Sequence, residues 1–252
     1  MIEARDLSLR LGSHMALHGA SFALARGKVC VILGGNGAGK SSLLRALAGL
    51  LPPFSGEVRL DDAPLAQLRP SERARRIGYL PQNGTPAWAV TVQELVGLGR
   101  LPYRAGFAAP SPADEAAIAQ ALADADLTRL ATRRVDSLSG GELARAKFAR
   151  VLAGESDWIL ADEPLANLDP PHQRDVLALL RAAADAGKGV VVVLHQLTEA
   201  ARIADDVILL KQGACLAAGP KPAVLTSAAL SETFDMAIDL VEIDGQVAVL
   251  PR

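Results

Sequence analysis

The chain has 252 residues, of which half are apolar and 21% are charged, and its formal net charge is −2. This balance is typical of a globular α/β protein with one sizeable core, and it excludes a disordered or fibrous chain. The near-neutral charge argues against a non-specific nucleic-acid-binding protein, because such domains usually carry a strong basic excess.

The sequence offers no candidate membrane span and no secretion signal. The longest aliphatic run, Val190 to Leu194, is far shorter than the roughly 20 apolar residues of a membrane helix. Charges of both signs follow Met1 and no apolar segment comes after them, so we expect no secretory signal. Cys30 and Cys215 lie far apart without metal-ligand spacing, which predicts free thiols in a reducing compartment.

Continuous apolar runs bounded by turn residues predict five strands. In chain order they lie near residues 29–33, 58–60, 158–161, 190–194 and 207–210. Most of these runs have the pattern of strands buried on both faces. Helical stretches separate them, which indicates a largely parallel sheet with helices on its faces.

Capping residues mark the starts of several helices. Thr91 with Glu94 forms a capping-box pattern, and Ser111 is an N-cap candidate followed by a proline. Asp169, again followed by proline, opens a helix that Gly187 is expected to stop.

Between Gln82 and Leu138 prolines punctuate helical stretches and no strand pattern occurs, which predicts an α-helical insertion. Alternation around an Asp-Gly pair over residues 241–249 predicts a C-terminal hairpin. We therefore expect one domain over residues 1–252, with a core formed by 1–85 and 156–252 and a subdomain formed by 86–155.

A phosphate-binding loop follows the first predicted parallel strand. Residues 34–41 match G-x-x-x-x-G-K-S and lie between a strand and a helix that starts at about Lys40. Backbone N–H groups at such a helix N-terminus converge on an anion, and glycines let the backbone approach it. Lys40 is expected to contact the β- and γ-phosphates and Ser41 to bind Mg²⁺. The expected nucleotide-binding residues are Gly34, Gly35, Asn36, Gly37, Ala38, Gly39, Lys40, Ser41 and Ser42.

Polar residues follow two more of the predicted strands. Asp162 and Glu163 end strand 158–161, at the sheet edge where ligands of parallel folds bind. Asp162 is suited to hold Mg²⁺ through water, and Glu163 to polarise an attacking water. His195 follows strand 190–194 and is expected to project towards the γ-phosphate. Alone, such residues are more often solvated or structural, but the phosphate loop favours a functional interpretation.

The other histidines, His14, His18 and His172, lack such support and are expected to be surface or packing residues. No His-Glu-x-x-His or cysteine cluster suggests zinc.

Together these motifs resemble the nucleotide-binding subunit of ATP-binding cassette (ABC) transporters, over about residues 2 to 235. The resemblance implies a P-loop NTPase cassette with a largely parallel core sheet, an N-terminal antiparallel β region and an inserted α-helical subdomain. It makes residues 34–42 the Walker A loop and Asp162 the Walker B aspartate. It further implies that the catalytic residues are Glu163, His195 and Gln82 and that the Mg²⁺ ligands are Ser41, Gln82 and Asp162. The D-loop then contains Asp169, and the signature motif is Leu138, Ser139, Gly140, Gly141 and Glu142.

The resemblance also implies a second copy of the chain as partner. Two copies sandwich two ATP molecules head to tail, and each signature motif completes the partner's site. A helix that opens at Ser139 and runs to about Ala153 could present its N-terminus to the γ-phosphate, which fits this arrangement. ATP and Mg²⁺ are the implied cofactors.

A finer resemblance points to importers of iron complexes, haem and cobalamin. It rests on residues 91–100, on Glu142 in the fifth signature position and on residues 168–173. It implies an ATPase peripheral to the cytoplasmic face of the inner membrane, coupled to a transmembrane permease and indirectly to a periplasmic binding protein, with no nucleic acid.

Other functions stay open at this point. ATPases of molybdate or tungstate importers share much of the pattern. A soluble ABC ATPase acting on DNA or the ribosome is a further alternative, although no coiled-coil insertion or second cassette occurs here. A P-loop kinase or GTPase would leave residues 138–142 unexplained, and the chain has no Asn-Lys-x-Asp sequence.

Some residues depart from the common family pattern. Leu11 occupies the region where many relatives place an aromatic ring against adenine. Smaller departures are Gly35 for proline, Ser42 for threonine, Ala144 for glutamine and Leu165 for threonine.

Two side-chain clusters remain. The aromatic residues between 79 and 107 either grip a permease helix or fill the subdomain core, and they are Tyr79, Trp88, Tyr103 and Phe107. The basic cluster of Arg69, Arg73, Arg75 and Arg76 surrounds Glu72 on a predicted helix, which favours a solvated face.

Overall fold

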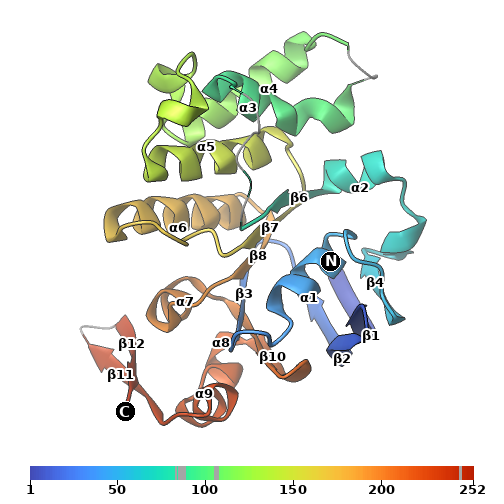
Figure 1. The fold of residues 1–252 in the computed structure, drawn as a ribbon, viewed down its shortest axis with the longest axis vertical. Coiled ribbons are helices and arrows are strands. Elements are labelled where there is room, and N and C mark those ends of the chain that lie inside the picture. Colours follow the sequence, from blue (N-terminus) through green and yellow to red (C-terminus); the bar gives the residue numbers. More distant parts are fainter. Residues whose placement is uncertain (83, 85–88, 105–107, 244–245) are drawn as a thin grey trace.

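The computed structural model describes all residues except 83, 85–88, 105–107 and 244–245 (Figure 1). The strands are β1 (Ile2–Leu11), β2 (His14–Leu24), β3 (Val29–Gly34), β4 (Ser55–Leu60), β5 (Ala63–Pro64), β6 (Ile77–Leu80), β7 (Trp158–Asp162), β8 (Gly189–Val193), β9 (Asp206–Lys211), β10 (Ala214–Pro220), β11 (Ile238–Ile243) and β12 (Gln246–Pro251). The α-helices are α1 (Lys40–Leu47), α2 (Pro70–Arg76), α3 (Val92–Gly97), α4 (Pro112–Asp124), α5 (Gly140–Ala153), α6 (Pro170–Asp185), α7 (Leu197–Ile203), α8 (Lys221–Val224) and α9 (Ser227–Phe234). Short 3₁₀ turns are η1 (Leu65–Gln67), η2 (Leu98–Tyr103), η3 (Thr128–Leu130) and η4 (Val135–Ser137).

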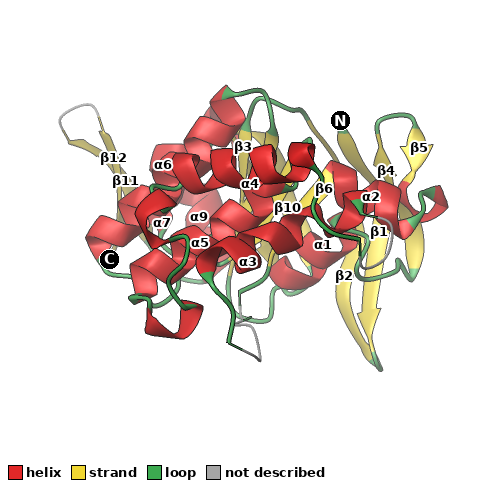
Figure 2. Ribbon diagram, turned by 90° about the horizontal axis from the view of Figure 1, so that it is seen from above, coloured by secondary structure: helices red, strands yellow, loops and turns green. Residues whose placement is uncertain are grey.

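Within the described residues, ten strands form one sheet in the order β5-β4-β1-β2-β10-β9-β3-β8-β7-β6. From β9 to β6 all neighbours are parallel, and β3, β7 and β8 are buried along their whole length. The prediction of a largely parallel core sheet is confirmed. Strands β1, β2, β4 and β5 pair antiparallel at the N-terminal end of the molecule (Figure 2).

Side chains of β3 alternate between two cores, because successive residues of a strand point to opposite faces. Val29, Val31 and Leu33 pack into a core with residues of α5, α6, α7 and α9. Cys30 and Ile32 pack on the opposite face with α1 and the antiparallel strands. Figure 1 shows α6 and α7 on one side of the sheet and α1 on the other. Each fully buried aliphatic side chain contributes about 1.5–3 kcal/mol, so both layers hold β3 in place.

A third apolar cluster joins α3, α4 and α5 above the sheet (Figure 1). Among the described residues between 82 and 138 the structure has helices, 3₁₀ turns and one isolated bridge, Thr91 to Arg134. The helical character of this stretch is thus confirmed where it is described, while the subdomain boundaries at 86 and 155 stay a prediction.

The three predicted helix starts are confirmed. Thr91 Oγ1 accepts from the Glu94 N–H at 3.2 Å, and Ser111 caps α4 in the same way. Asp169 occupies the N-cap position of α6 with Pro170 at the first helical position, as predicted, although its side chain makes no cap hydrogen bond. The two residues after it are prolines, which have no N–H to donate.

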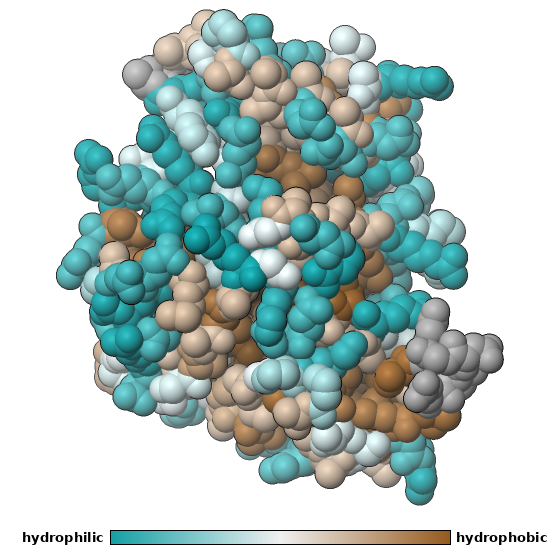
Figure 3. All heavy atoms as spheres, turned by 180° about the vertical axis from the view of Figure 1, so that it is seen from behind, coloured by the Kyte–Doolittle hydropathy of each residue, from teal (hydrophilic) through white to brown (hydrophobic). Residues whose placement is uncertain are grey.

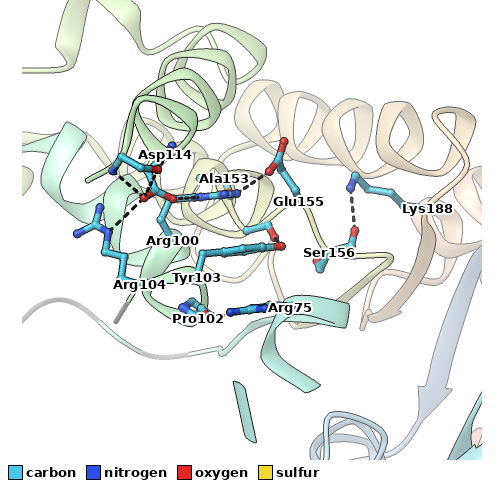
Figure 4. A network of polar contacts seen from close by, with 12 residues as sticks. Arg75, Arg100, Pro102, Tyr103, Arg104, Asp114, Ala153, Glu155, Ser156 and Lys188 are labelled. Carbon is cyan, nitrogen blue, oxygen red and sulfur yellow. Dashed lines mark hydrogen bonds and ion pairs between the residues drawn. The ribbon is translucent and has the colours of Figure 1, made fainter. Parts of the chain in front are cut away.

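A buried ion pair ties the helices together near the end of α5 (Figure 4). Arg100 Nε donates to Asp114 Oδ1 at 2.8 Å, and both side chains are about one-twentieth exposed. The same guanidinium donates to the Ala153 carbonyl at 2.9 Å and to Glu155 at 2.6 Å. A cation at the carboxyl end of a helix is favourable because the last carbonyls there lack partners.

Tyr103 lies inside this network. Its hydroxyl donates to the Gly154 carbonyl at 2.8 Å, and the guanidinium carbons of Arg100 and Arg75 lie 3.9 and 5.0 Å from its ring centroid (Figure 4). Of the two functions left open for the aromatic residues, the structure therefore favours internal packing for Tyr103. Trp88 and Phe107 lie outside the described residues.

The basic cluster on α2 is less uniformly solvated than predicted. Arg69 pairs with Glu72 at the surface, as expected. Arg75 instead donates to the Pro102 carbonyl at 2.9 Å, and Arg76 pairs with Asp157, so part of the cluster joins α2 to neighbouring segments.

The predicted C-terminal hairpin is confirmed, since β11 and β12 pair antiparallel in a separate two-stranded sheet. Met236, Val241 and Leu250 are exposed there, and Figure 3 shows an apolar area at that end of the molecule. Among the described residues, no helix combines the length and the apolar character that crossing a membrane requires.

Candidate active site

The carboxyl ends of four parallel strands meet at one sheet edge. In β3, Ile32 pairs with Val193 of β8, and Val193 pairs with Asp162 of β7. Leu80, the last residue of β6, pairs with Ala161. Asp162 ends β7 and Glu163 follows it. The phosphate loop, Gln82 and His195 come within two residues of the ends of β3, β6 and β8, so the sheet brings all of them together.

The phosphate loop needs glycine at position 39, where another residue would be strained. Gly39 has φ +100°, and a Cβ added there would lie 2.2 Å from the Ala16 carbonyl oxygen. Lys40 reaches back across the loop and donates to the carbonyls of Gly34 at 2.9 Å and Gly35 at 2.8 Å. Burial lowers the pKa of Lys40, and the neighbouring carboxylates at 162 and 163 oppose that shift.

A hollow of about 270 Å³ lies over this loop. Its described lining contains the loop residues 36–42, Glu163, and three residues of β1 and β2, namely Leu11, His14 and Ala16. The N-terminus of α1, where unpaired N–H groups favour an anion, opens into it. Leu11 was expected here from the family resemblance, and His14 was expected at the surface or in packing. Both are exposed and lie in the wall of the hollow, His14 just after the turn between β1 and β2.

Asp162 is 1% exposed and has two hydrogen-bond donors. Ser41 Oγ donates to its Oδ1 at 2.9 Å, and the Tyr79 hydroxyl donates to its Oδ2 at 3.4 Å. Burial raises the pKa of Tyr79, which keeps this hydroxyl a donor. The side chains of Ser41 and Asp162 offer hard oxygen ligands, which suit Mg²⁺.

The described residues contain no group of three or more His, Cys, Asp or Glu side chains that could hold a metal ion. Mg²⁺ that is bound beside phosphates usually takes only one or two protein carboxylates and completes its shell with water and phosphate oxygens.

The three predicted catalytic residues come together at Glu163. Its Oε1 lies 2.6 Å from His195 Nε2, and its Oε2 accepts from the Gln82 side-chain amide. Glu163 has φ +49°, a left-handed conformation that turns the chain sharply after β7. Backbone strain of this kind is commonly found at functional sites. The carboxylate is thereby held from two sides at the mouth of the hollow.

The signature residues and the D-loop form a separate group. No residue from 138 to 142 is among the described residues that line the hollow over the phosphate loop. Ser139 Oγ accepts from the Glu142 N–H at 3.3 Å and Glu142 accepts from the Ser139 N–H at 2.7 Å, so they form the capping box of α5. The hydrogen bond from the Ser139 N–H is the main cause that lowers the pKa of Glu142. Asp169 is exposed at the start of α6, next to the signature helix.

Comparison with known proteins finds relatives of this chain. A family model described as "ABC transporter" matches residues 17–166. A hemin import ATP-binding protein of Bordetella parapertussis is 41% identical over the whole chain and 99% of its own length.

Two solved structures are similar over most of the chain. One, described as the inward-facing conformation of a metal-chelate type ABC transporter, has a TM-score of 0.87 and 29% identity, and covers 100% of this chain and 97% of its own. The other is the dimeric ATP-binding cassette MJ0796 bound to ADP and phosphate, with a TM-score of 0.73 and 29% identity, over 87% of this chain and 98% of its own. The matched sequence, the shared fold and the site at the edge of the parallel sheet agree: the chain belongs to the ABC transporter family and is one of its ATP-hydrolysing subunits.

Proposed function

We propose that two copies of this chain form a head-to-tail dimer whose ATP hydrolysis drives import of haem or a similar metal chelate, such as a ferric siderophore or cobalamin. A separate membrane permease carries the cargo, and the chain sits against it at the cytoplasmic face of the inner membrane. The name of the Bordetella relative and the metal-chelate type of the solved neighbour support this cargo class. The proposal includes no nucleic acid.

The proposed nucleotide site uses the hollow over the phosphate loop. Lys40 and the N–H groups of residues 36–42 bind the phosphates of ATP, and Leu11 and His14 lie where the base can rest. Ser41, Asp162 and Gln82 would hold Mg²⁺, which supplies charge neutralisation for the phosphates. Glu163 accepts a proton from the attacking water, while His195 and Gln82 keep its carboxylate oriented.

The observation that carries the dimer is Gly140. This residue is exposed, its φ is not in the left-handed region, and a Cβ added to it would meet nothing within 4 Å. Nothing described within the chain therefore requires glycine there. A phosphate held by the other copy's loop does provide a reason, because α5 begins at this point and its N-terminus attracts anions.

A Ser139→Arg variant tests the dimer. It should still bind ATP through its own phosphate loop but lose hydrolysis and ATP-dependent dimerisation, measured by nucleotide titration, phosphate release and gel filtration. Native turnover in this variant would contradict the two-copy site.

The permease contact is proposed at a hollow of about 380 Å³ between α2, β6, η2 and α5. Leu50, 57% exposed, lines it, and Leu101 of η2, 53% exposed, lies beside Pro102 in its wall. A subdomain spanning residues 86–155, supported by the separate apolar cluster of α3, α4 and α5, would carry the motion between this surface and the signature helix.

Reconstitution with the permease tests contact and cargo together. Leu50→Ser and Leu101→Ser should reduce cargo-stimulated hydrolysis, whereas Phe54→Ser, an equally exposed apolar residue packed on Arg10 elsewhere, should not. Proteoliposomes offered haem, ferric siderophore, cobalamin or molybdate in separate arms should take up one of the first three. Uptake of molybdate alone would refute the proposed cargo class.

A further inference from the structure

The second signature glycine, Gly141, is in a different environment from the first. It is buried, and a Cβ added there would lie 2.2 Å from Cγ and 2.4 Å from Cδ2 and Nδ1 of His172. The imidazole of His172, in the first turn of α6, therefore occupies the space that any side chain at 141 would need. These are ring atoms close to the His172 backbone, so the contact can be relieved only if the ring rotates away or the two helices separate.

Polar contacts hold the His172 ring in this place. Its Nδ1 lies 3.5 Å from Asp175 Oδ2, and its Nε2 lies 3.8 Å from Asp169 Oδ1. Arg145, on the signature helix, donates to the same Asp175 oxygen at 3.2 Å. The ion pair of Arg145 and Asp175 thus joins α5 to α6 at one ring nitrogen of His172. Asp169 of the D-loop lies at the other ring nitrogen.

We propose that His172 is a positioning residue that fixes the signature motif against the D-loop, so that both present themselves to the second copy as one unit. This rests on the proposed function, in which these motifs complete the other copy's ATP site. The structure thereby separates the tasks of two adjacent glycines. Gly141 is required by packing within the chain, and Gly140 by the ligand of the other copy.

A double-mutant cycle tests this assignment. Gly141→Ala should lower kcat strongly, because the added methyl overlaps the ring, and His172→Ala in the same chain should restore about tenfold of that loss, a typical size for coupling between contacting residues. Gly140→Ala is the matched control. It makes the same chemical change one residue away, where no ring contacts it, and His172→Ala should not rescue it.

A split between kinetic parameters separates positioning from general damage. His172→Ala alone should lower kcat several-fold while KM for ATP changes by less than about twofold, because the phosphate loop of the same chain is untouched. In a Glu163→Gln background the same change should weaken ATP-dependent dimerisation in gel filtration. A variant that had merely unfolded would also lose binding of a fluorescent ATP analogue.

The outcomes distinguish the two proposals. If the native chain does not hydrolyse ATP and its Glu163→Gln variant forms no ATP-dependent dimer, the proposed function fails. If hydrolysis and the dimer are both observed, but His172→Ala rescues Gly141→Ala no better than Gly140→Ala, only the assignment of His172 is overturned.

Discussion

Replacing Glu163 with glutamine removes the candidate base while keeping the size of the side chain. In the structure this carboxylate is 17% exposed and contacts both the Gln82 amide and His195. An amide offers one acceptor oxygen in place of two, so it cannot keep both contacts as an acceptor, and it cannot take a proton from water at neutral pH. Loss of a positioned base costs about 10²–10⁴ in kcat. That loss corresponds to roughly 3–5 kcal/mol in the activation barrier.

Binding should respond in the opposite direction. Glu163 is one of the negative charges that act on Lys40, so its removal relieves repulsion of the ATP phosphates and the Kd for ATP should stay the same or fall. Phosphate release and titration with a fluorescent ATP analogue measure the two effects. Glu199→Gln, the same change on α7 where the side chain pairs with Arg202, is the matched control and should leave kcat unchanged. A Glu163→Gln variant with kcat within about threefold of native would refute the reasoning.

Two further predictions concern the phosphate loop and acid stability. Gly39→Ala should weaken ATP binding at least tenfold in fluorescence titration, because the added methyl overlaps the Ala16 carbonyl and φ +100° strains any residue but glycine. Gly35→Ala is the control and should bind ATP normally, because its added Cβ contacts nothing within 4 Å. Hydrogen bonds from Arg100 first, then from Ser111, lower the pKa of Asp114 to about 2. Because the folded-state pKa lies below the unfolded value of about 3.9, this contribution to stability is complete above about pH 4 and is lost as the pH falls towards 2. Urea unfolding between pH 5 and pH 2.5 should show a smaller decrease for Asp114→Asn than for the native chain; equal slopes would contradict the role of this carboxyl.

The sequence predicted the strands that are buried on both faces, because a short continuous aliphatic run such as Val190 to Val193, bounded by turn residues, indicates a buried strand. It did not predict β1 and β2 from their pattern, since the register shifts between Ala4 and Leu7, around Asp6 at φ +45°, and the alternation slips. It also missed β10, which is rich in Ala and Gly and ends at a proline. This segment is a strand because it pairs antiparallel with β9, and the strand propensities of its own residues do not predict that pairing.

The same distinction holds for the site. The residues that follow strands in sequence, Asp162, Glu163 and His195, could be placed at one sheet edge from the order of the elements alone. The contacts of Tyr79 with Asp162 and of His172 with Gly141 join segments 83 and 31 residues apart, and no spacing rule connects them. A polar aromatic three residues before Gln82 was the signal available for the first; the second needed the packing of α5 on α6.

The position of the signature motif outside its own chain's hollow has a genetic consequence. In a head-to-tail dimer, a Lys40→Ala copy still contributes an intact signature, and a Ser139→Arg copy still contributes an intact phosphate loop. A mixed dimer of these two inactive proteins rebuilds one complete site, so the two alleles should complement each other. Either allele expressed with the native gene in equal amount leaves about a quarter of randomly paired dimers wholly native, and both should therefore behave as partially dominant.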